Sequence, residues 1–410
     1  MVEGSQFRSA PASLLCVLAV ACSAPGGSSD GDTTLPLGRV ATSSEGMVVS
    51  GSEPATRVGA EILASGGNAV DAAIATAFAL AVTEPTQSGL GGRTQALVWR
   101  PDGPALGIDA TNEVPASYDP DTAEQVDDGY GVIAIPGTVA GLTRLHDMAG
   151  SLPLTSLIAP AVALAEGGFP LSEGEAQRLA GIRDRLLLSG AASSALLAAD
   201  GSAYAPGDSL RQPVLAEVLR AIAEGGSEAF YDGWVAERMA ADIADHGGYV
   251  TTEDLAGYAA EASIVVEGRF GELGLVGTYL PASGATTIEA LQILDRVGLS
   301  DMEADRRAFT IGQALVFAYA DRDEAWDDER PPSEDANWIT SEDLAADRAR
   351  ALTDATVETP ASKEPPESPN TTHISVVDHN GMAVAMTQSL GPTGGSRVAT
   401  EGLGFLYAAS

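Results

Sequence analysis

A threonine pair, Thr371-Thr372, follows a Pro- and Glu-rich stretch at 354–370 and precedes a segment of alternating polarity. A threonine hydroxyl is a weak nucleophile unless a base lies beside it. If the bond between Asn370 and Thr371 is cut, the new α-amino group, with a pKa of about 8, can serve as that base. Such chemistry requires a cleavable bond in an exposed, mobile loop directly before a rigid strand, which is the order found here. The spacing alone leaves a simpler alternative open, a threonine-rich strand start after a loop.

Other catalytic patterns in the sequence are weak. There is no HExxH pair, so we expect no catalytic zinc, and no GxSxG elbow, which argues against a hydrolase serine of that type. The glycines of "SGLGG" at 88–92 favour a tight turn over a phosphate loop. The acidic run at 321–335 lacks the glycine of a calcium loop, which favours a solvated helix end. We therefore predict neither a metal nor a cofactor. The four histidines are scattered, at His146, His246, His373 and His379.

The formal net charge of −35 limits the classes of partner. Nucleic acid and anionic membrane surfaces require basic patches, so neither is expected to bind. Lys363 is the only lysine. An acidic, lysine-poor surface keeps proteins soluble in concentrated salt, but a GC-rich genome also depletes lysine, and both explanations stay open. The 45% hydrophobic content over 410 residues fits a globular protein of one large domain or two ordinary ones.

Both cysteines, Cys16 and Cys22, lie at the N-terminus, so the remainder of the chain has no disulfide framework. Residues 14–21 form an apolar run that is too short to span a bilayer and ends in "LAVAC". This resembles a bacterial lipoprotein signal, with residues 1–22 as signal peptide, a lipid anchor on Cys22 and a flexible tether at 23–38. The protein would then be exported, as a periplasmic or membrane-anchored lipoprotein or an extracellular enzyme. Plain secretion or a misplaced start codon are the alternatives, because Arg8 is the only positive side chain before the apolar run.

The elements that would position Thr371 follow from periodicity. Asn380-Gly381 is a strong hairpin-turn signal, and it joins "HISVVD" to "MAVAMTQS" as two strands. Alternation places Thr372, Ile374 and Val376 on one face of the first strand and His373, Ser375 and Val377 on the other. Residues 68–82 are apolar nearly all round, which predicts a buried helix. The other expected elements are a strand at 46–52, a hairpin at 89–116 turning at "RPDG", strands at 262–267 and 273–279, a helix beginning at Thr252, and helices at 54–67, 137–149, 154–166, 173–185, 212–224, 284–296 and 304–324.

The stretch "TTHISVVDHNGMAVAMTQS" resembles the start of the small subunit in the γ-glutamyltranspeptidase family, whose pattern is T-T-H-x-S-V-V-D-x-x-G. Further blocks resemble the family in the family's own order, so the resemblance runs from about residue 39 to 410. These blocks are "ILASGGNAVDAAIATAFALAVTEP", "IPGTVAGL", "GGYVTTEDLAGY", "LPASGATTIEALQIL" and "FAYADRDE".

The resemblance implies an α+β fold, the αββα sandwich of N-terminal-nucleophile hydrolases with a large helical subunit region. One chain would be cut into two subunits, with 39–353 as the large-subunit region, 354–370 as the processing loop and 371–410 as the start of the small subunit. By position, Thr371 would attack the Asn370 carbonyl and afterwards a γ-glutamyl amide such as glutathione. Water or an amino acid would resolve the acyl-enzyme. Residues expected to support the nucleophile are Thr372, His373 and Ser389, the last replacing a second family threonine.

Three positions depart from the family pattern. Thr111, in "IDATNEVPA", stands where the family has an arginine for the substrate α-carboxylate, so a bidentate contact is lost. Arg93 interrupts the glycine run "GLGGRTQA"; it either supplies the missing charge or is a surface arginine. Gly391 replaces an asparagine that contacts the glutamate. These departures motivate an alternative, an acylase with a different acyl specificity, as in the related cephalosporin acylases.

The end of the chain also differs from the family. Family small subunits extend far beyond the nucleophile, whereas 40 residues run from Thr371 to Ser410. The later part would carry an acidic residue for the substrate amine, a Ser-Ser pair and the Gly-Gly donors of the oxyanion hole. The resemblance therefore predicts a fold that is incomplete at the C-terminus, and an inactive remnant is the third hypothesis.

Overall fold

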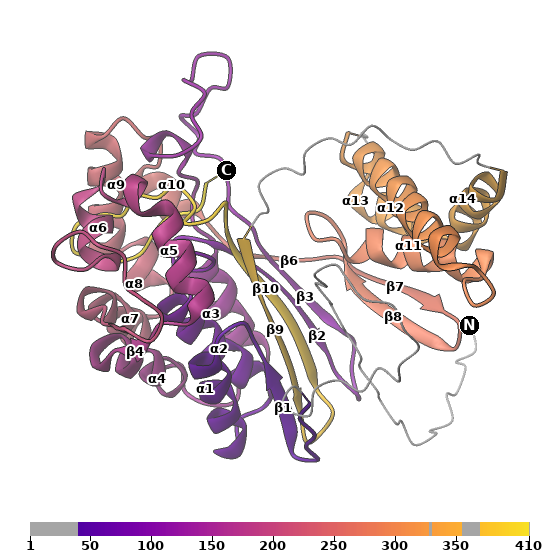
Figure 1. The fold of residues 1–410 in the computed structure, drawn as a ribbon, viewed down its shortest axis with the longest axis horizontal. Coiled ribbons are helices and arrows are strands. Elements are labelled where there is room, and N and C mark those ends of the chain that lie inside the picture. The colour runs from indigo at the N-terminus through magenta and orange to yellow at the C-terminus, as the bar shows by residue number, and fades with distance from the viewer. Residues whose placement is uncertain (1–39, 328–329, 355–369, 410) are drawn as a thin grey trace. The chain divides into compact units, whose positions relative to one another are not determined.

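The computed structural model describes residues 40–327, 330–354 and 370–409, and Ser43–Ser410 forms one compact unit. The expected signal peptide with its lipidation site Cys22, the tether at 23–38 and residues 355–369 of the processing loop lie outside the described residues. The secondary structure is a mixture of helices and antiparallel sheet, as predicted for an α+β fold (Figure 1).

The main sheet has six antiparallel strands in the order β1-β9-β10-β2-β3-β6. The predicted hairpin at Asn380-Gly381 is confirmed, and Gly381 has the positive φ of +83° that such a turn requires. Strands from both ends of the described chain therefore meet in one sheet (Figure 1). The bounds are β1 Gly46–Val49, β2 Arg93–Trp99, β3 Leu106–Ala110, β6 Glu261–Ala262, β9 Asn370–Asp378 and β10 Ala383–Gly391.

One face of this sheet packs against helices α1 (Glu53–Ala64), α2 (Ala69–Thr83) and α3 (Thr138–Ala149). Every residue of α2 is buried, as its apolar sequence predicts, and its start is fixed by a capping box between Asn68 and Asp71. The helix-facing side of β9 carries the predicted set of buried residues, which are Thr372, Ile374 and Val376. The predicted αββα sandwich has two sheets between two helical layers. The described residues form one such sheet, the main sheet, and the helical layer on one face of it (Figure 1).

The segment between α3 and the second half of the chain is mostly helical, as expected. The predicted helices at 154–166, 173–185 and 212–224 correspond to α4, α5 and α7, each within two residues at either end. The bounds are α4 Leu154–Gly167, β4 Phe169–Pro170, α5 Glu173–Leu186, α6 Gly190–Leu196, β5 Ser209–Leu210, α7 Pro213–Gly225, α8 Glu228–Tyr231, α9 Trp234–Asp245 and α10 Thr252–Gly257, with a short 3-10 turn, η2, at Tyr130–Val132.

A second group of elements follows β6. The single strand predicted at 262–267 is wrong: Glu261–Ala262 pairs with β3, whereas Val265 begins pairing with Thr278 in a separate two-stranded sheet. The acidic run at 321–335 is also not simply solvated, because Asp321 and Asp335 are buried. The bounds are β7 Val265–Phe270, β8 Leu273–Thr278, α11 Gly284–Val297, α12 Ala304–Asp327, α13 Pro332–Ile339 and α14 Glu342–Asp354.

Candidate active site

The candidate nucleophile, Thr371, lies near the start of β9 on the face of the sheet opposite α2. Its direct partner across the β9–β10 ladder is Ser389, and the partner of Ser389 across the next ladder is Arg93. Directly opposed residues of an antiparallel sheet share a face, so the three side chains form one row. Thr371 is exposed to solvent, Ser389 is 5% exposed and Arg93 is half-buried. We call Thr371, Ser389 and Arg93 the nucleophile row.

A hydrogen bond joins the first two members of the nucleophile row. The Oγ1 atom of Thr371 lies 3.1 Å from Oγ of Ser389. The same Ser389 oxygen accepts the backbone N–H of Gly391 at 2.9 Å. The Ser389 hydroxyl therefore contacts both the Thr371 hydroxyl and the backbone N–H of Gly391, and this arrangement can hold the threonine hydroxyl in a single orientation.

A β-bulge in β10 creates this geometry. The register shifts between Ser389 and Gly391, so that Gly391 opposes Asn370 and the residue between has no partner on β9. Gly391 has φ of +87°, and a Cβ atom there would lie 2.9 Å from the Ala409 carbonyl oxygen. The departure from the family asparagine therefore has a local structural reason, because this position combines left-handed backbone with close approach of another segment.

The other two residues expected to support the nucleophile lie in different surroundings. His373 is on the Thr371 face, where its Nδ1 is 2.8 Å from Thr387 Oγ1, and burial lowers its pKa below the usual 6.5. A neutral His373 can position the neighbouring hydroxyl but adds no charge. Thr372 points to the helix side, so it does not share a face with Thr371.

Beneath Thr372 lies a buried carboxyl group that sequence reasoning missed. Glu84, at the end of α2, is 4% exposed, and burial raises its pKa while the nearby guanidinium of Arg178 opposes that rise. Within the described part of the chain neither Thr372 Oγ1 nor Glu84 Oε2 completes a hydrogen bond. In the sequence, the sign of this carboxyl group is the Glu84 of "TEP", at the end of the apolar helix, and such a tripeptide resembles an ordinary helix end.

Thr111 directly follows β3, and two hydrogen bonds of its backbone hold it in place. Its N–H donates to Asp109 Oδ1 at 3.0 Å, and its carbonyl accepts the Tyr258 hydroxyl at 2.6 Å. Since Ala110 is the partner of Thr94, Thr111 lies at the level of Arg93 on the neighbouring strand. The structure thus brings all three departures, Arg93, Thr111 and Gly391, to the same end of the sheet.

Acidic side chains occupy the strands beyond Arg93. Burial raises the pKa of Asp109, and it also raises that of Glu113, in both cases with help from the nearby carboxylate of Glu261. Gln95 donates a hydrogen bond to Asp109. A metal site does not follow from this, since no group of three or more His, Cys, Asp or Glu side chains in the described ranges could hold an ion.

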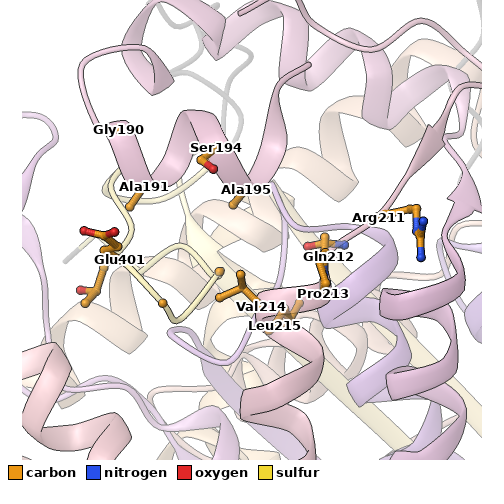
Figure 2. A pocket seen from close by; sticks show the side chains of 13 residues that line it. Gly190, Ala191, Ser194, Ala195, Arg211, Gln212, Pro213, Val214, Leu215 and Glu401 are labelled. Carbon is orange, nitrogen blue, oxygen red and sulfur yellow. The ribbon is translucent and has the colours of Figure 1, made fainter. Parts of the chain in front are cut away.

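The nucleophile row does not line the large cavity shown in Figure 2. A cavity of about 690 Å³ lies between α6, the start of α7 and residues 400–404, with Arg211 and Glu401 at opposite ends of it (Figure 2). Neither Thr371 nor Ser389 is among the described residues that line it. The nucleophile row lies instead on the face of the main sheet opposite α2, where Thr371 is exposed and Ser389 is buried. Within the part of the chain that the structure covers, no helix is long and apolar enough to cross a bilayer.

Comparisons with known proteins show which family the chain matches. Residues 55–409 match the family model described as gamma-glutamyltranspeptidase. The glutathione hydrolase proenzyme of Escherichia coli (strain K12) is 34% identical over 88% of this chain, and the acylase ACY 1 proenzyme of Pseudomonas sp. (strain V22) is 30% identical over 89%. The matched regions cover 65% and 69% of those two proteins, so the chain spans just under two thirds of the length of the Escherichia coli relative.

Two solved structures have a fold similar to that of this chain. Cephalosporin acylase from Bacillus halodurans superposes with a TM-score of 0.76 at 27% identity, covering 89% of this chain and 69% of that one. Helicobacter pylori gamma-glutamyltranspeptidase superposes with a TM-score of 0.73 at 29% identity, covering 80% of this chain and 97% of that one.

Proposed function

The chain belongs to the gamma-glutamyltranspeptidase family and has the N-terminal-nucleophile hydrolase fold, and we propose that it cuts itself between Asn370 and Thr371. Thr371 then transfers the γ-glutamyl group of glutathione, or of a related amide, to water or to an amino acid. This proposal rests on one observation: near the start of β9 the exposed hydroxyl of Thr371 is hydrogen-bonded to Ser389 of β10.

Processing and turnover use the same hydroxyl. In processing, Oγ1 of Thr371 attacks the carbonyl carbon of Asn370, and its proton passes to the amide nitrogen as the peptide C–N bond breaks, which frees the α-amine of Thr371 and leaves an ester. Water then opens that ester, giving a carboxylate on Asn370 and restoring the Thr371 hydroxyl. In turnover that amine takes the proton of Oγ1 as the oxygen attacks the donor amide, and passes it to the departing amine. Water or an acceptor amine then attacks the acyl-enzyme ester and regenerates the hydroxyl.

The sheet topology supports a two-subunit product that stays associated. Cleavage before Thr371 would give two pieces: the large-subunit region at 39–353 with the processing loop at 354–370 still attached, and a small-subunit segment starting at 371. Strand β9 lies between β1 and β10, and β10 pairs with β2, so the small-subunit segment occupies the interior of the sheet. The curated relatives are named as proenzymes, in keeping with such maturation.

A second candidate function is hydrolysis of another acyl amide. Thr111 provides no guanidinium where the family has one, and the relatives include an acylase and a cephalosporin acylase. Comparing γ-glutamyl and glutaryl anilides as donors separates the two functions. A clear preference for γ-glutamyl would eliminate the acylase.

The proposal is tested by intact mass under denaturing conditions after incubation of the purified protein. We expect a new species whose sequence begins Thr-Thr-His, and its absence from Thr371→Ala. Thr372→Ala is the matched control, since its side chain lies on the opposite face. A chain that stays whole under all conditions, or a cut at another bond, would refute the proposed nucleophile.

Export as a lipoprotein is the remaining part of the proposal. It is supported by the apolar run and small residues that precede Cys22. Metabolic labelling with a fatty acid should modify the parent protein and leave Cys22→Ala unlabelled. Labelling of both proteins, or of neither, would argue for another export route or none.

A further inference from the structure

We propose that Arg93 is the carboxylate-binding residue for the acyl donor, so that donors carry a carboxylate at the far end of a short acyl chain, as γ-glutamyl and glutaryl groups do. This rests on the proposed role of Thr371. It differs from the family pattern, in which the guanidinium comes from the position of Thr111, on the segment after β3.

The first argument is that the Arg93 guanidinium has no countercharge among the residues that the structure describes. Burial lowers its pKa, and no carboxylate contributes to that shift. In the described ranges its side chain forms neither an ion pair nor a hydrogen bond with another residue. By contrast, the partly buried Arg178, Arg348 and Arg397 each bind a carboxylate.

An unpaired, partly desolvated cation is unfavourable, and this chain has 57 acidic residues that could have neutralised it. Asp109, on the neighbouring strand, has other partners, since it accepts hydrogen bonds from Gln95 and from the Thr111 backbone. Arg93 therefore has the properties of a site that is completed by an anionic ligand.

The second argument is distance along the nucleophile row. Opposed side chains on adjacent antiparallel strands have Cβ atoms about 5 Å apart, so the Cβ atoms of Thr371 and Arg93 are separated by about 10 Å, with Ser389 between them. An arginine side chain reaching along the row shortens this gap to the length of a short acyl chain. A donor whose carbonyl lies at Thr371 Oγ1 can then place a terminal carboxylate on the guanidinium, which matches its geometry bidentately.

The third argument is that the positive charge missing at Thr111 is present on the neighbouring strand, at Arg93. Thr111 follows Ala110, the partner of Thr94, so it lies beside Arg93 at the same level of the sheet, and its side chain is shorter than the arginine of the family pattern. The charge lost at Thr111 and the charge gained at Arg93 thus fall next to each other. Because Arg93 recognises only the carboxylate, it does not distinguish γ-glutamyl from glutaryl donors.

Steady-state kinetics with three anilide donors test the inference: γ-glutamyl, glutaryl and the uncharged pentanoyl. Arg93→Met should lower kcat/KM about 100-fold for the two charged donors, mainly through KM, and change pentanoyl turnover little. Arg93→Lys should recover part of the loss, because a point charge lacks the bidentate fork. Adding Thr111→Arg to Arg93→Met should restore much of it. Arg57→Met, which removes an exposed arginine of α1, is the control.

An equal loss for all three donors, or no loss, would overturn the role of Arg93. Glutarate binding to Thr371→Ala, measured by calorimetry with and without Arg93→Met, tests the anion site without turnover. A protein that is never cut at Thr371 but binds glutarate through Arg93 would contradict the proposed function while supporting this inference. Failure of the Thr371→Ala protein to bind glutarate would contradict the inference alone.

Discussion

The carboxylate of Asp378, at the end of β9, accepts the backbone N–H of Ala69 in the first turn of α2, with an Oδ2–N distance of 3.1 Å. Its other oxygen accepts the N–H groups of Asn380 and Met382 in the hairpin turn. One buried side chain therefore joins the strand that carries the candidate nucleophile to the most buried helix and also shapes the turn.

Asp378→Ala leaves three backbone N–H groups without their acceptor, so we expect the free energy of unfolding to fall by about 2–4 kcal/mol. Asp378→Asn keeps one carbonyl acceptor and should lose roughly half as much. Urea unfolding monitored by circular dichroism measures both. A loss below about 0.5 kcal/mol for Asp378→Ala would contradict this assignment.

Ser389→Ala removes the partner of Thr371 Oγ1 and the acceptor of the Gly391 N–H. We expect appearance of the Thr371 terminus to slow by about 10- to 100-fold, because the hydroxyl loses its orientation. Ser389→Thr, which keeps the hydroxyl, should process at close to the parent rate. A time course of intact mass measures this, and equal rates for Ser389→Ala and Ser389→Thr would show that the hydrogen bond is not used.

Gly391→Ala should be more destabilising than an alanine at another glycine with positive φ. Both Gly391 (φ +87°) and Gly66 (φ +93°) have left-handed backbone, but only at Gly391 would a Cβ atom meet another segment, the Ala409 carbonyl. We expect a loss of about 1 kcal/mol for Gly66→Ala, from strain alone, and about 2–4 kcal/mol for Gly391→Ala. Thermal unfolding of the two variants checks the difference, and equal losses would mean that the close approach relaxes freely.

Glu289 of α11 gives a prediction for pH. It is fully buried, and burial together with the adjacent Asp321 raises its pKa to about 9, while Arg348 binds Asp321 and opposes the rise. Because the folded-state pKa lies above the ordinary value of 4.5, the unfolded state loses its proton first as the pH increases. Stability should therefore fall between about pH 4.5 and pH 9.

Glu289→Gln removes this titration and keeps an N–H donor for Asp321. The variant should be more stable than the parent above pH 6, by an amount that increases with pH to the order of a few kcal/mol. Melting temperatures from pH 5 to pH 9 measure the slope, with the exposed Glu217→Gln as control. Parallel curves for Glu289→Gln and the parent would exclude a protonated Glu289.

Local pattern alone determined much of the fold. The apolar sequence of α2, the Asn380-Gly381 turn and the alternation along β9 each depend on neighbours within a few residues, and all three are confirmed. The resemblance around Thr371 also identified the family from the sequence alone.

Only the tertiary structure decided the relations between distant segments. Period-two alternation assigns a face within a strand, but the register between strands depends on the bulge after Ser389 and on the packing against α2. The row of Thr371, Ser389 and Arg93 thus joins residues almost 300 positions apart, a placement that no local pattern contains. The division of 262–267 into β6 and β7 likewise depends on distant partners, because Glu261–Ala262 pairs with β3 whereas Val265–Phe270 pairs with β8.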